Sequence, residues 1–467
     1  MTSADDGDRA GAASASGISN LTRQSAAPGF RDTIFAPATG PGRAAIGVVR
    51  LSGPACGAAL AALTGAAPPP AERRATLRTL RDPVSGEALD RALILRFAAP
   101  RSYTGEDMVE LQVTGGRAVL AAVVGALARL DGLRPAEPGE FALRAFENGK
   151  LDLSQVEGLA DLVDAQTEAQ RRQALRIAGG ALSREAEAIR ALILEATARI
   201  EAQIDFSDQD EVDAAGVEQA RALARDALSR LARSLATARA GERLREGLEV
   251  VIAGPPNVGK STLMNAIARR DVSIVSPIPG TTRDPVEVAL ELRGLPVALV
   301  DTAGLRESEE PVEREGIARA RRRAAAADLT LWLSDGAGPG SPPGEGRTAV
   351  LLVRTKMDLP GRTAPPGTIA VSAATGEGID RLLDAIADFA EEALTGQGSA
   401  LIALARHRLA FEEAAASLGR MLRQEDAALE FIAEDLRLAA RALERIAGRI
   451  DVEDVLGAIF SRLCIGK

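Results

Sequence analysis

Short hydrophobic runs bounded by glycine or proline characterise the first part of the chain. Residues 32–149 include "AIGVVRLSG", "ALILRFAAP" and "DMVELQVTGG", in which apolar side chains cluster over a few positions. Runs of this length, rich in branched residues and closed by turn-forming residues, are typical of β-strands. The pattern predicts a compact α+β domain over residues 32–149.

The spacing of apolar residues becomes helical after Leu151. From "LSQVEGLADLVDAQTEAQ" to "ALILEATARIEAQIDF" they recur at the three- and four-residue spacing of one helix face. The same spacing returns in "ALIALARHRLAFEEAAASLGR", late in the chain. We interpret residues 150–246 and 395–467 as two pieces of one all-α domain.

A third pattern separates the two helical pieces. Between residues 247 and 394 the runs "LEVVIA", "PVALVD", "LTLWLSD" and "TAVLLVRTK" are almost continuously apolar and alternate with helical stretches. This alternation is typical of parallel strands buried on both faces. The prediction is a multidomain chain in which a doubly wound α/β domain, residues 247–394, interrupts the helical domain.

Composition narrows the functional classes. The 467 residues carry a formal net charge of −9, which argues against a general basic field that coats nucleic acid. No run reaches the roughly 18 apolar residues of a membrane span. Two cysteines, Cys56 and Cys464, do not resemble a secreted disulfide framework, although their number permits one bond. We expect a cytoplasmic protein that does not enter a membrane.

The first 31 residues are small and polar, with acidic residues near the start. They lack the apolar core of a signal peptide and the acid-poor character of a transit peptide, so we expect a disordered tail. The single histidine, His407, lies in a helical pattern. One histidine excludes metal sites built from several, and we expect His407 to be a structural or surface residue.

One motif between a predicted strand and a predicted helix indicates a phosphate site. "GPPNVGKST", residues 254–262, has the spacing of a phosphate-binding loop that ends in Gly259, Lys260 and Ser261. Glycines allow backbone N–H groups to surround phosphates, the lysine reaches the β- and γ-phosphates, and the serine hydroxyl is a ligand for Mg²⁺.

Further elements follow in the order typical of a GTPase. "PGTTRD" supplies Thr282 as a second hydroxyl for Mg²⁺, and "DTAG" places Asp301 beside the magnesium shell. In "TKMD" the carboxylate of Asp358 can accept the N1–H and 2-amino hydrogens of guanine, and "SAATG" would close over the base. The predicted GTP-binding residues are Asn257, Val258, Gly259, Lys260, Ser261, Thr262, Ser276, Thr281, Thr282, Asp301, Thr302, Ala303, Gly304, Thr355, Lys356, Asp358, Ser372 and Ala373.

GTPases usually carry asparagine where this sequence has Thr355. Threonine lacks the geometry of the amide, so we expect a weaker hold on the base. Asp358 would still preserve the preference for guanine.

These elements and the regions around them resemble the MnmE (TrmE) family of tRNA modification GTPases. The resemblance extends to "DTIFAPATGPGRAAIGVVRLSG", "RSYTGEDMVELQVTGG", "PGEFALRAFENGKLDLSQVEG" and the terminal "CIGK", in family order from residue 32 to residue 467. Besides Thr355, the sequence departs from the family at "VTGG", where a histidine commonly precedes the two glycines.

The resemblance implies that residues 32–149 bind a one-carbon tetrahydrofolate, in the 5-formyl or methylene form, and form a homodimer. The implied folate contacts are Arg50, Glu110, Lys150 and Lys467. From the residues alone, Arg50 and Lys150 would be solvated surface charges. The thiol of Cys464 would be catalytic near the one-carbon group, whereas the sequence alone favours a packed apolar filler.

The resemblance also implies a Ras-like P-loop GTPase domain inserted in the discontinuous helical domain. The implied partner is the flavoprotein MnmG (GidA), which alone carries FAD and forms a heterotetramer with this family. Together they would add a carboxymethylaminomethyl or aminomethyl group to carbon 5 of the wobble uridine of tRNA.

Hydrolysis needs a group that orients water, and Leu305 follows "DTAG" where many small GTPases have glutamine. The resemblance assigns this role to Glu313, and it assigns the missing transition-state charge to a potassium ion. The implied potassium ligands are Asn257, Ser276, Ile278 and Thr281.

Two other functions fit part of the sequence. A GTP-switched ribosome-assembly factor that binds rRNA would be expected to carry a recognisable RNA-binding module, and it would need neither a folate site nor a terminal thiol. A GTPase with a scaffold coiled coil is disfavoured because the helical patterns are interrupted and short.

Overall fold

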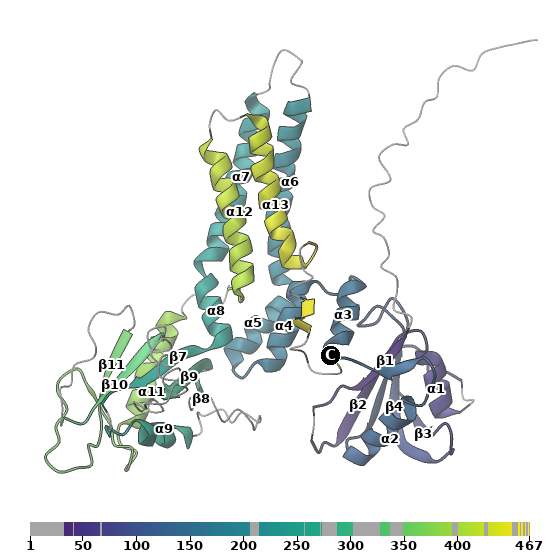
Figure 1. Ribbon diagram of the computed structural model, residues 1–467, viewed down its shortest axis with the longest axis horizontal. Coiled ribbons are helices and arrows are strands. Elements are labelled where there is room, and N and C mark those ends of the chain that lie inside the picture. Colours follow the sequence, from purple (N-terminus) through teal and green to yellow (C-terminus); the bar gives the residue numbers. More distant parts are fainter. Residues whose placement is uncertain are drawn as a thin grey trace, which may run out of the picture. The chain divides into compact units, whose positions relative to one another are not determined.

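The computed structural model describes residues 32–40, 42–65, 68–205, 214–255, 257–270, 272, 287–301, 327–336, 349–394, 400–424, 428–450, 456–457, 459–460, 463 and 466. The chain divides into two compact units. The first unit is Met1–Lys150 with Leu463–Lys467, and the second is Leu151–Arg462. Figure 1 labels the helices and strands of both.

The first unit is built on one mixed sheet. Its strands are β1 (Thr33–Pro37), β2 (Ile46–Ser52), β3 (Thr76–Arg81), β4 (Ala88–Phe97), β5 (Met108–Thr114) and β6 (Leu133–Pro135). Their order is β3-β4-β5-β2-β1-β6, and only β6 pairs in parallel with its neighbour. The helices are α1 (Cys56–Thr64), α2 (Arg117–Leu127) and α3 (Glu140–Glu147). The α+β prediction is confirmed.

Alternation along the strands separates the two faces of this sheet. Val49 and Leu51 are buried in the core that α1 and α2 cover, whereas Phe141 of α3 belongs to a second cluster with β1. Successive side chains of a strand point to opposite faces. Arg50 and, on β5, Glu110 therefore point away from the main core, toward the face that α3 covers.

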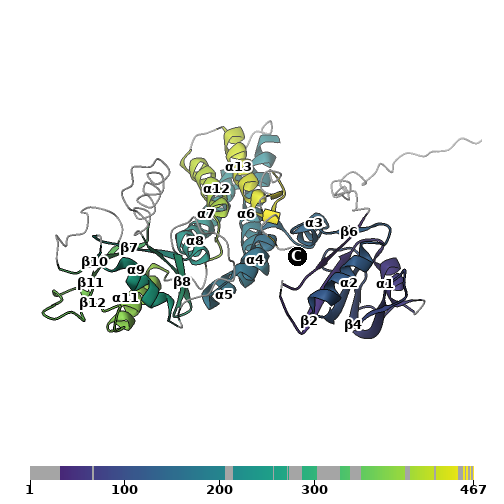
Figure 2. The ribbon, with the colours of Figure 1, turned by 60° about the horizontal axis from the view of Figure 1, so that its bottom comes forward.

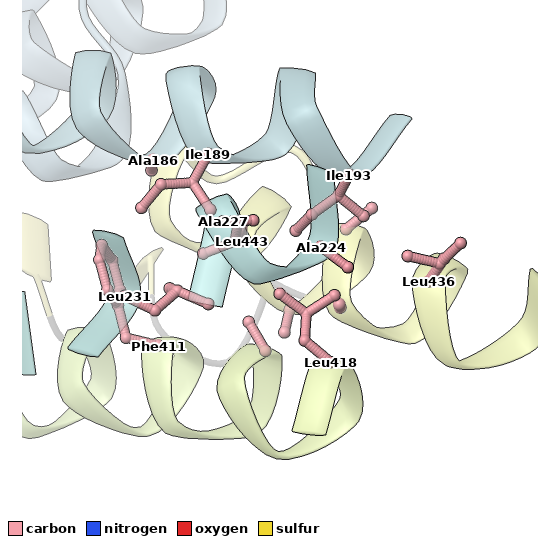
Figure 3. Close-up of a cluster of buried hydrophobic side chains, with 14 of the residues drawn as sticks. Ala186, Ile189, Ile193, Ala224, Ala227, Leu231, Phe411, Leu418, Leu436 and Leu443 are labelled. Carbon is pink, nitrogen blue, oxygen red and sulfur yellow. The ribbon is translucent and has the colours of Figure 1, made fainter. Parts of the chain in front are cut away.

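The helices that precede and follow the inserted sheet in the sequence form one bundle in the second unit, and its core contains side chains from both groups. They are α4 (Leu153–Asp164), α5 (Glu168–Ala178), α6 (Ala181–Asp205), α7 (Ala214–Ala236), α8 (Ala238–Glu246), α12 (Ala405–Arg423) and α13 (Leu429–Ala447). Figure 3 shows Ile189 of α6, Leu231 of α7, Phe411 of α12 and Leu443 of α13 in one cluster. The prediction of a discontinuous helical domain is confirmed.

The inserted sheet has the predicted α/β architecture. Its strands are β7 (Leu248–Ala253), β8 (Glu287–Leu292), β9 (Leu295–Asp301), β10 (Leu329–Ser334), β11 (Ala349–Arg354) and β12 (Ile369–Ala370). Helices α9 (Lys260–Ala268) and α11 (Ile379–Ala393) share a core with one face (Figure 2). The order is β12-β11-β10-β7-β9-β8, and only β8 runs antiparallel to its neighbour. The loop after β7 therefore lies at the switch point where such sheets bind ligands.

His407 is buried where α12 meets α4. Its Nε2 is 2.9 Å from Oε2 of Glu157, and Arg406 also donates to this carboxylate. Nη1 of Arg406 further donates to the carbonyl O of Arg445, at the end of α13, at 3.2 Å. Burial lowers the pKa of His407, against the opposing effect of the Glu157 carboxylate. The expectation of a structural histidine is confirmed.

Across the described residues, no helix is long and apolar enough to cross a membrane.

We expect the free energy of unfolding of the helical domain to fall as the pH drops from 7 to 5.5. Because the pKa of His407 is lowered from 6.5, the unfolded chain takes up a proton in this window that the folded chain does not. The slope for one group is at most about 1.4 kcal/mol per pH unit. The pKa of Glu157 is lowered from 4.5, so its contribution is lost only at more acidic pH.

Urea unfolding at a series of pH values measures this effect, and His407→Gln is the control because the chain has one histidine. In the variant, the free energy of unfolding should depend less steeply on pH between pH 7 and 5.5. The same slope in both proteins would contradict the assignment.

Gly158 is expected to be irreplaceable in α4. A Cβ atom there would lie 2.4 Å from the backbone N of Ala178, on α5. Gly158→Ala should therefore separate α4 from α5 and lower the free energy of unfolding by about 2–3 kcal/mol. Gly125→Ala is the matched control, because only Arg129 lies within 4 Å of a Cβ there, at 3.8 Å. Because Gly125 lies inside helix α2, Gly125→Ala should raise the free energy of unfolding by about 0.5–1 kcal/mol. Equal effects of the two substitutions in urea titrations would refute the packing argument.

Candidate functional site

The loop between β7 and α9 has the shape that a phosphate-binding loop requires. Gly254 has a φ of +146°, and a Cβ there would lie 2.4 Å from the carbonyl O of Leu333 on β10. Gly259, the residue before α9, has a φ of +100°. The two glycines let the chain turn closely against the sheet and direct the N-terminus of α9 toward the loop, where an anion is favoured.

Lys260 curls back over this loop. Its Nζ donates to the carbonyl O atoms of Gly254 and Pro255, both at 2.9 Å. Burial lowers the pKa of Lys260, and the charge of Asp301 opposes this shift. Because the two carbonyls are neutral acceptors, phosphate oxygens can replace them with a stronger, charge-assisted interaction.

Ser261 and Asp301 meet as a magnesium site requires. Ser261 Oγ, at the start of α9, donates to Oδ2 of Asp301 at 2.9 Å, and Asp301 ends strand β9. A hydroxyl and a carboxylate are the hard oxygen ligands that Mg²⁺ prefers. These two residues therefore fit the metal that the loop motif implies.

A cavity of about 230 Å³ lies beside the phosphate loop, where the base is expected. It is lined by Val258, Gly259, Thr262, Leu263, Thr355, Lys356, Asp358, Leu359, Val371, Ala373 and Ala374. Oδ1 of Asp358 accepts a hydrogen bond from Ser372 Oγ at 2.7 Å, and Ser372 is fully buried. Nζ of Lys356 donates to Oδ2 of Asp335 at 2.8 Å. Asp358 is thus held in a fixed orientation at the cavity.

Thr355 links the base loop to the phosphate loop. Its Oγ1 donates to the carbonyl O of Val258 at 2.7 Å, and it also lies 3.3 Å from the carbonyl O of Ser334. The side chain is 4% exposed. The threonine that replaces the usual asparagine therefore still ties the two loops together, while its effect on base affinity stays a prediction.

Arg50 and Glu110 form the centre of a second site, in the first unit. The two residues are partners across β2 and β5, and Nη2 of Arg50 donates to Oε1 of Glu110 at 2.9 Å. Nη1 of Arg50 donates to the carbonyl O of Gly466 at 3.1 Å. The Arg50 guanidinium also lies 5.4 Å from the ring centre of Tyr103 and 5.8 Å from that of Phe141.

Arg50 is therefore no isolated surface charge, since its side chain is 21% exposed and has partners on three sides. Lys150 is exposed, and its Nζ donates to the carbonyl O of Pro100 at 3.0 Å. Pro100 begins the loop that carries Tyr103. The structure thus brings Arg50 and Glu110 together and places Lys150 on the neighbouring loop.

Asn257 lies in the phosphate loop, is exposed, and has a φ of +59°. The remaining predicted residues lie outside the described part of the chain. They are Ser276, Ile278, Thr281, Thr282, Thr302, Ala303, Gly304, Glu313, Cys464 and Lys467. Cys56 is a free, buried thiol whose pKa burial raises to about 12.

The geometry adds residues to both sites that the sequence patterns do not indicate. Asp335 pairs with Lys356. Its position directly after the apolar run that forms β10 is the sequence feature that could have indicated it. Tyr103, Phe141 and Gly466 surround Arg50. Tyr103 and Phe141 stand inside quoted family signatures, but no local pattern connects them with Arg50.

A phosphate loop at the switch point of a mostly parallel sheet, a hydroxyl–carboxylate pair for Mg²⁺ and a fixed aspartate at the base cavity define a P-loop GTPase, here inserted in a helical domain. Two family models match the chain: "GTP-binding protein TrmE N-terminus" over residues 33–150 and "MnmE helical domain" over residues 153–464, a range that includes the GTPase domain. The chain belongs to the MnmE family of tRNA modification GTPases and is a GTP-hydrolysing enzyme.

Similar relatives span nearly the whole chain. The tRNA modification GTPase MnmE of Beijerinckia indica subsp. indica is 54% identical over 436 residues, which cover 93% of this chain and 96% of the relative. The protein of the same name from Methylobacterium sp. (strain 4-46) is 55% identical over 445 residues, 93% of this chain and 100% of the relative. That of Rhodospirillum rubrum is 52% identical over 460 residues, with 93% and 99% covered.

Asp358→Asn should weaken GTP binding by at least about 100-fold, because two hydrogen bonds to a charged carboxylate are lost. Binding of a fluorescent GTP analogue measures the loss. Xanthosine triphosphate is the control nucleotide, because its 2-carbonyl accepts from the new amide where guanine offers a 2-amino donor. The variant should therefore prefer the xanthosine nucleotide, and unchanged GTP affinity would show that the base binds elsewhere.

Proposed function

We propose that this protein is the GTP-hydrolysing component of a tRNA-modifying complex that acts on the wobble uridine. With a one-carbon tetrahydrofolate and a flavoprotein of the MnmG (GidA) type, it adds a carboxymethylaminomethyl or aminomethyl group at carbon 5. The folate is bound in the 5-formyl or methylene form, and FAD belongs to the partner only. The reaction takes place in the cytoplasm.

One observation carries this proposal: a GTPase site and the Arg50–Glu110 site occur in one chain, and Arg50 of the second site also bonds the backbone of Gly466. Gly466, whose carbonyl accepts from Arg50, belongs to the terminal "CIGK". A ribosome-assembly factor has no use for such an arrangement. The relatives that match 93% of the chain carry the name of a tRNA modification GTPase.

The folate is supported by the chemistry of the residues around Arg50. Arg50, Lys150 and Lys467 would supply cations to the acidic tail or the ring oxygens of a folate, and Glu110 would accept from a ring N–H. The ring of Tyr103 adds a flat surface beside Arg50. These residues fit a pterin with a carboxylate tail, and the folate would supply the one-carbon group.

In the GTPase site, Lys260 would exchange its two carbonyl partners for phosphate oxygens, and Ser261 with Thr282 would hold Mg²⁺. Glu313 would orient the attacking water. Potassium, held by Asn257, Ser276, Ile278 and Thr281, would balance the charge that develops on the phosphates.

The proposed assembly is a homodimer through residues 32–149 that joins MnmG in a heterotetramer. The proposed divisions of the chain are a tail (1–31), the folate-binding domain (32–149), helical pieces (150–246 and 395–467) and the GTPase domain (247–394). Within the last helical piece, Leu463 and Gly466 group with the first unit, which supports a role of the terminal motif at the folate site.

Mass analysis of tRNA nucleosides from a strain that lacks the protein tests the proposal. We expect the C5 substituent of wobble uridine to disappear and to return when the gene is restored. Unchanged nucleosides together with accumulated ribosome precursors would establish the assembly factor instead.

Cys464→Ser should abolish or strongly reduce wobble-uridine modification while GTP hydrolysis and folding stay nearly unchanged. The substitution almost preserves volume and hydrogen bonding but removes the thiolate nucleophile. Cys464 stands two positions before Gly466 in the sequence, and the carbonyl of Gly466 accepts from Arg50. Cys56→Ser is the matched control, because that buried thiol donates to the carbonyl of Asp107 on another part of the unit. Normal modification by Cys464→Ser would reduce the terminal thiol to a packing role.

A further inference from the structure

Tyr103 is the single tyrosine of the chain, and its hydroxyl is buried. Its ring lies 5.4 Å from the Arg50 guanidinium. Among the described residues, no donor or acceptor pairs with the phenol oxygen, which is closed off from solvent. Burial also raises the pKa of Tyr103, so the hydroxyl keeps its proton.

A buried hydroxyl without a partner has lost its hydrogen bonds to water without a replacement, which destabilises the folded chain. Native proteins pair nearly all such groups, and each exception needs a reason, such as a catalytic role or a bound water or ion. A phenylalanine at this position would keep the ring on Arg50 and avoid the penalty. A ligand that supplies a partner for the hydroxyl would remove this cost.

Neighbouring residues, rather than the hydroxyl, hold Tyr103 in place. On one side Asn148 Nδ2 donates to the carbonyl O of Thr104 at 2.8 Å. On the other, the hydroxyls of Thr104 and Ser52 lie 2.6 Å apart. Lys150 adds its bond to Pro100 at the start of the loop. The ring is thus fixed before a ligand arrives, which lowers the entropy lost on binding.

We propose that the Tyr103 hydroxyl hydrogen-bonds to the polar edge of the folate head group and determines specificity at the Arg50–Glu110 site. This inference rests on the proposed folate-binding function. Glu110 only accepts and Arg50 only donates, whereas a phenol does both. It can therefore pair with a ring nitrogen, a carbonyl or the formyl oxygen that separates one folate form from another.

Tyr103→Phe separates a ligand-binding hydroxyl from one that only stabilises the fold. The first role predicts a loss of folate affinity without a loss of stability, and the second predicts a loss of stability with unchanged affinity. We expect affinity for 5-formyltetrahydrofolate, measured by calorimetry on the full chain, to fall roughly tenfold. The melting temperature should stay the same or rise, since an unpartnered hydroxyl is removed. Thr64→Val is the matched control: it deletes a hydroxyl that donates to the carbonyl of Leu60 at 2.8 Å. That variant should lose stability and keep its affinity within about twofold.

Because there is one tyrosine, ¹³C-labelling at Cζ gives a single resonance that reports only on Tyr103. Saturation with 5-formyltetrahydrofolate should move this resonance, as a new hydrogen bond to the phenol requires. A shift with the expected loss of affinity in Tyr103→Phe supports the inference. A stationary resonance, or a Tyr103→Phe variant with unchanged affinity, overturns it while folate binding itself stands.

Wild-type protein that does not bind the folate would overturn the folate part of the proposed function and this inference together. Binding of the fluorescent GTP analogue by the same sample distinguishes that result from a failed preparation. In protein that binds the folate, Arg50→Ala should weaken affinity more than Tyr103→Phe does, because it removes the group that contacts both Glu110 and Tyr103.

Discussion

The core of the helical bundle is complete only when helices from before and after the inserted sheet in the sequence pack together, and the fold of the second unit depends on this packing. Phe411 and Leu418 of α12 pack with Ile189 of α6 and Leu231 of α7 (Figure 3). The two connections to the sheet therefore start and end at one bundle. At Gly241, in the helix that leads into the sheet, a Cβ would lie 2.1 Å from the carbonyl O of Ile402, in the segment that returns from it. Such close approach leaves no room for a side chain at that crossing.

Buried charges fix the junctions that hydrophobic packing leaves adjustable. Glu157 accepts from both Arg406 and His407, and thereby sets where α12 begins against α4. In the first unit, the fully buried Arg144 pairs with Asp32 on one side and Glu140 on the other. Buried ion pairs often add little stability, because desolvation offsets their attraction. Their directional bonds instead select one arrangement of the elements they join.

Local sequence predicted the parts of this protein that are local in structure. The strand runs, the helical spacing and the loop that ends in Lys260 all depend on neighbours within a few residues, and each lies where the pattern put it. The single charges in "VVRLS" and "VELQV" also indicate that Arg50 and Glu110 point away from the main core. What no local pattern contains is the register that makes them partners across β2 and β5. From the sequence alone Arg50 is therefore indistinguishable from a surface charge, and only the family resemblance indicates a role for it.

The same reason explains why Gly466 was missed. Its partner Arg50 lies 416 positions earlier in the chain, and the bond forms through a backbone carbonyl, which every residue offers. The specific signal is the glycine: its φ is +95°, and a Cβ would lie 2.2 Å from the carbonyl O of Pro37 on β1. Sequence shows a glycine near the end of the chain, but only the strand beside it shows why no other residue fits.

The two junctions of the first unit with the helical elements carry predicted folate residues. The unit's main segment ends at Lys150, directly before α4, and its terminal segment begins at Leu463, after α13. Lys150 bonds the loop that carries Tyr103, and Gly466 bonds Arg50. A ligand that engages this loop and Arg50 would therefore contact residues that hold both segments of the first unit together.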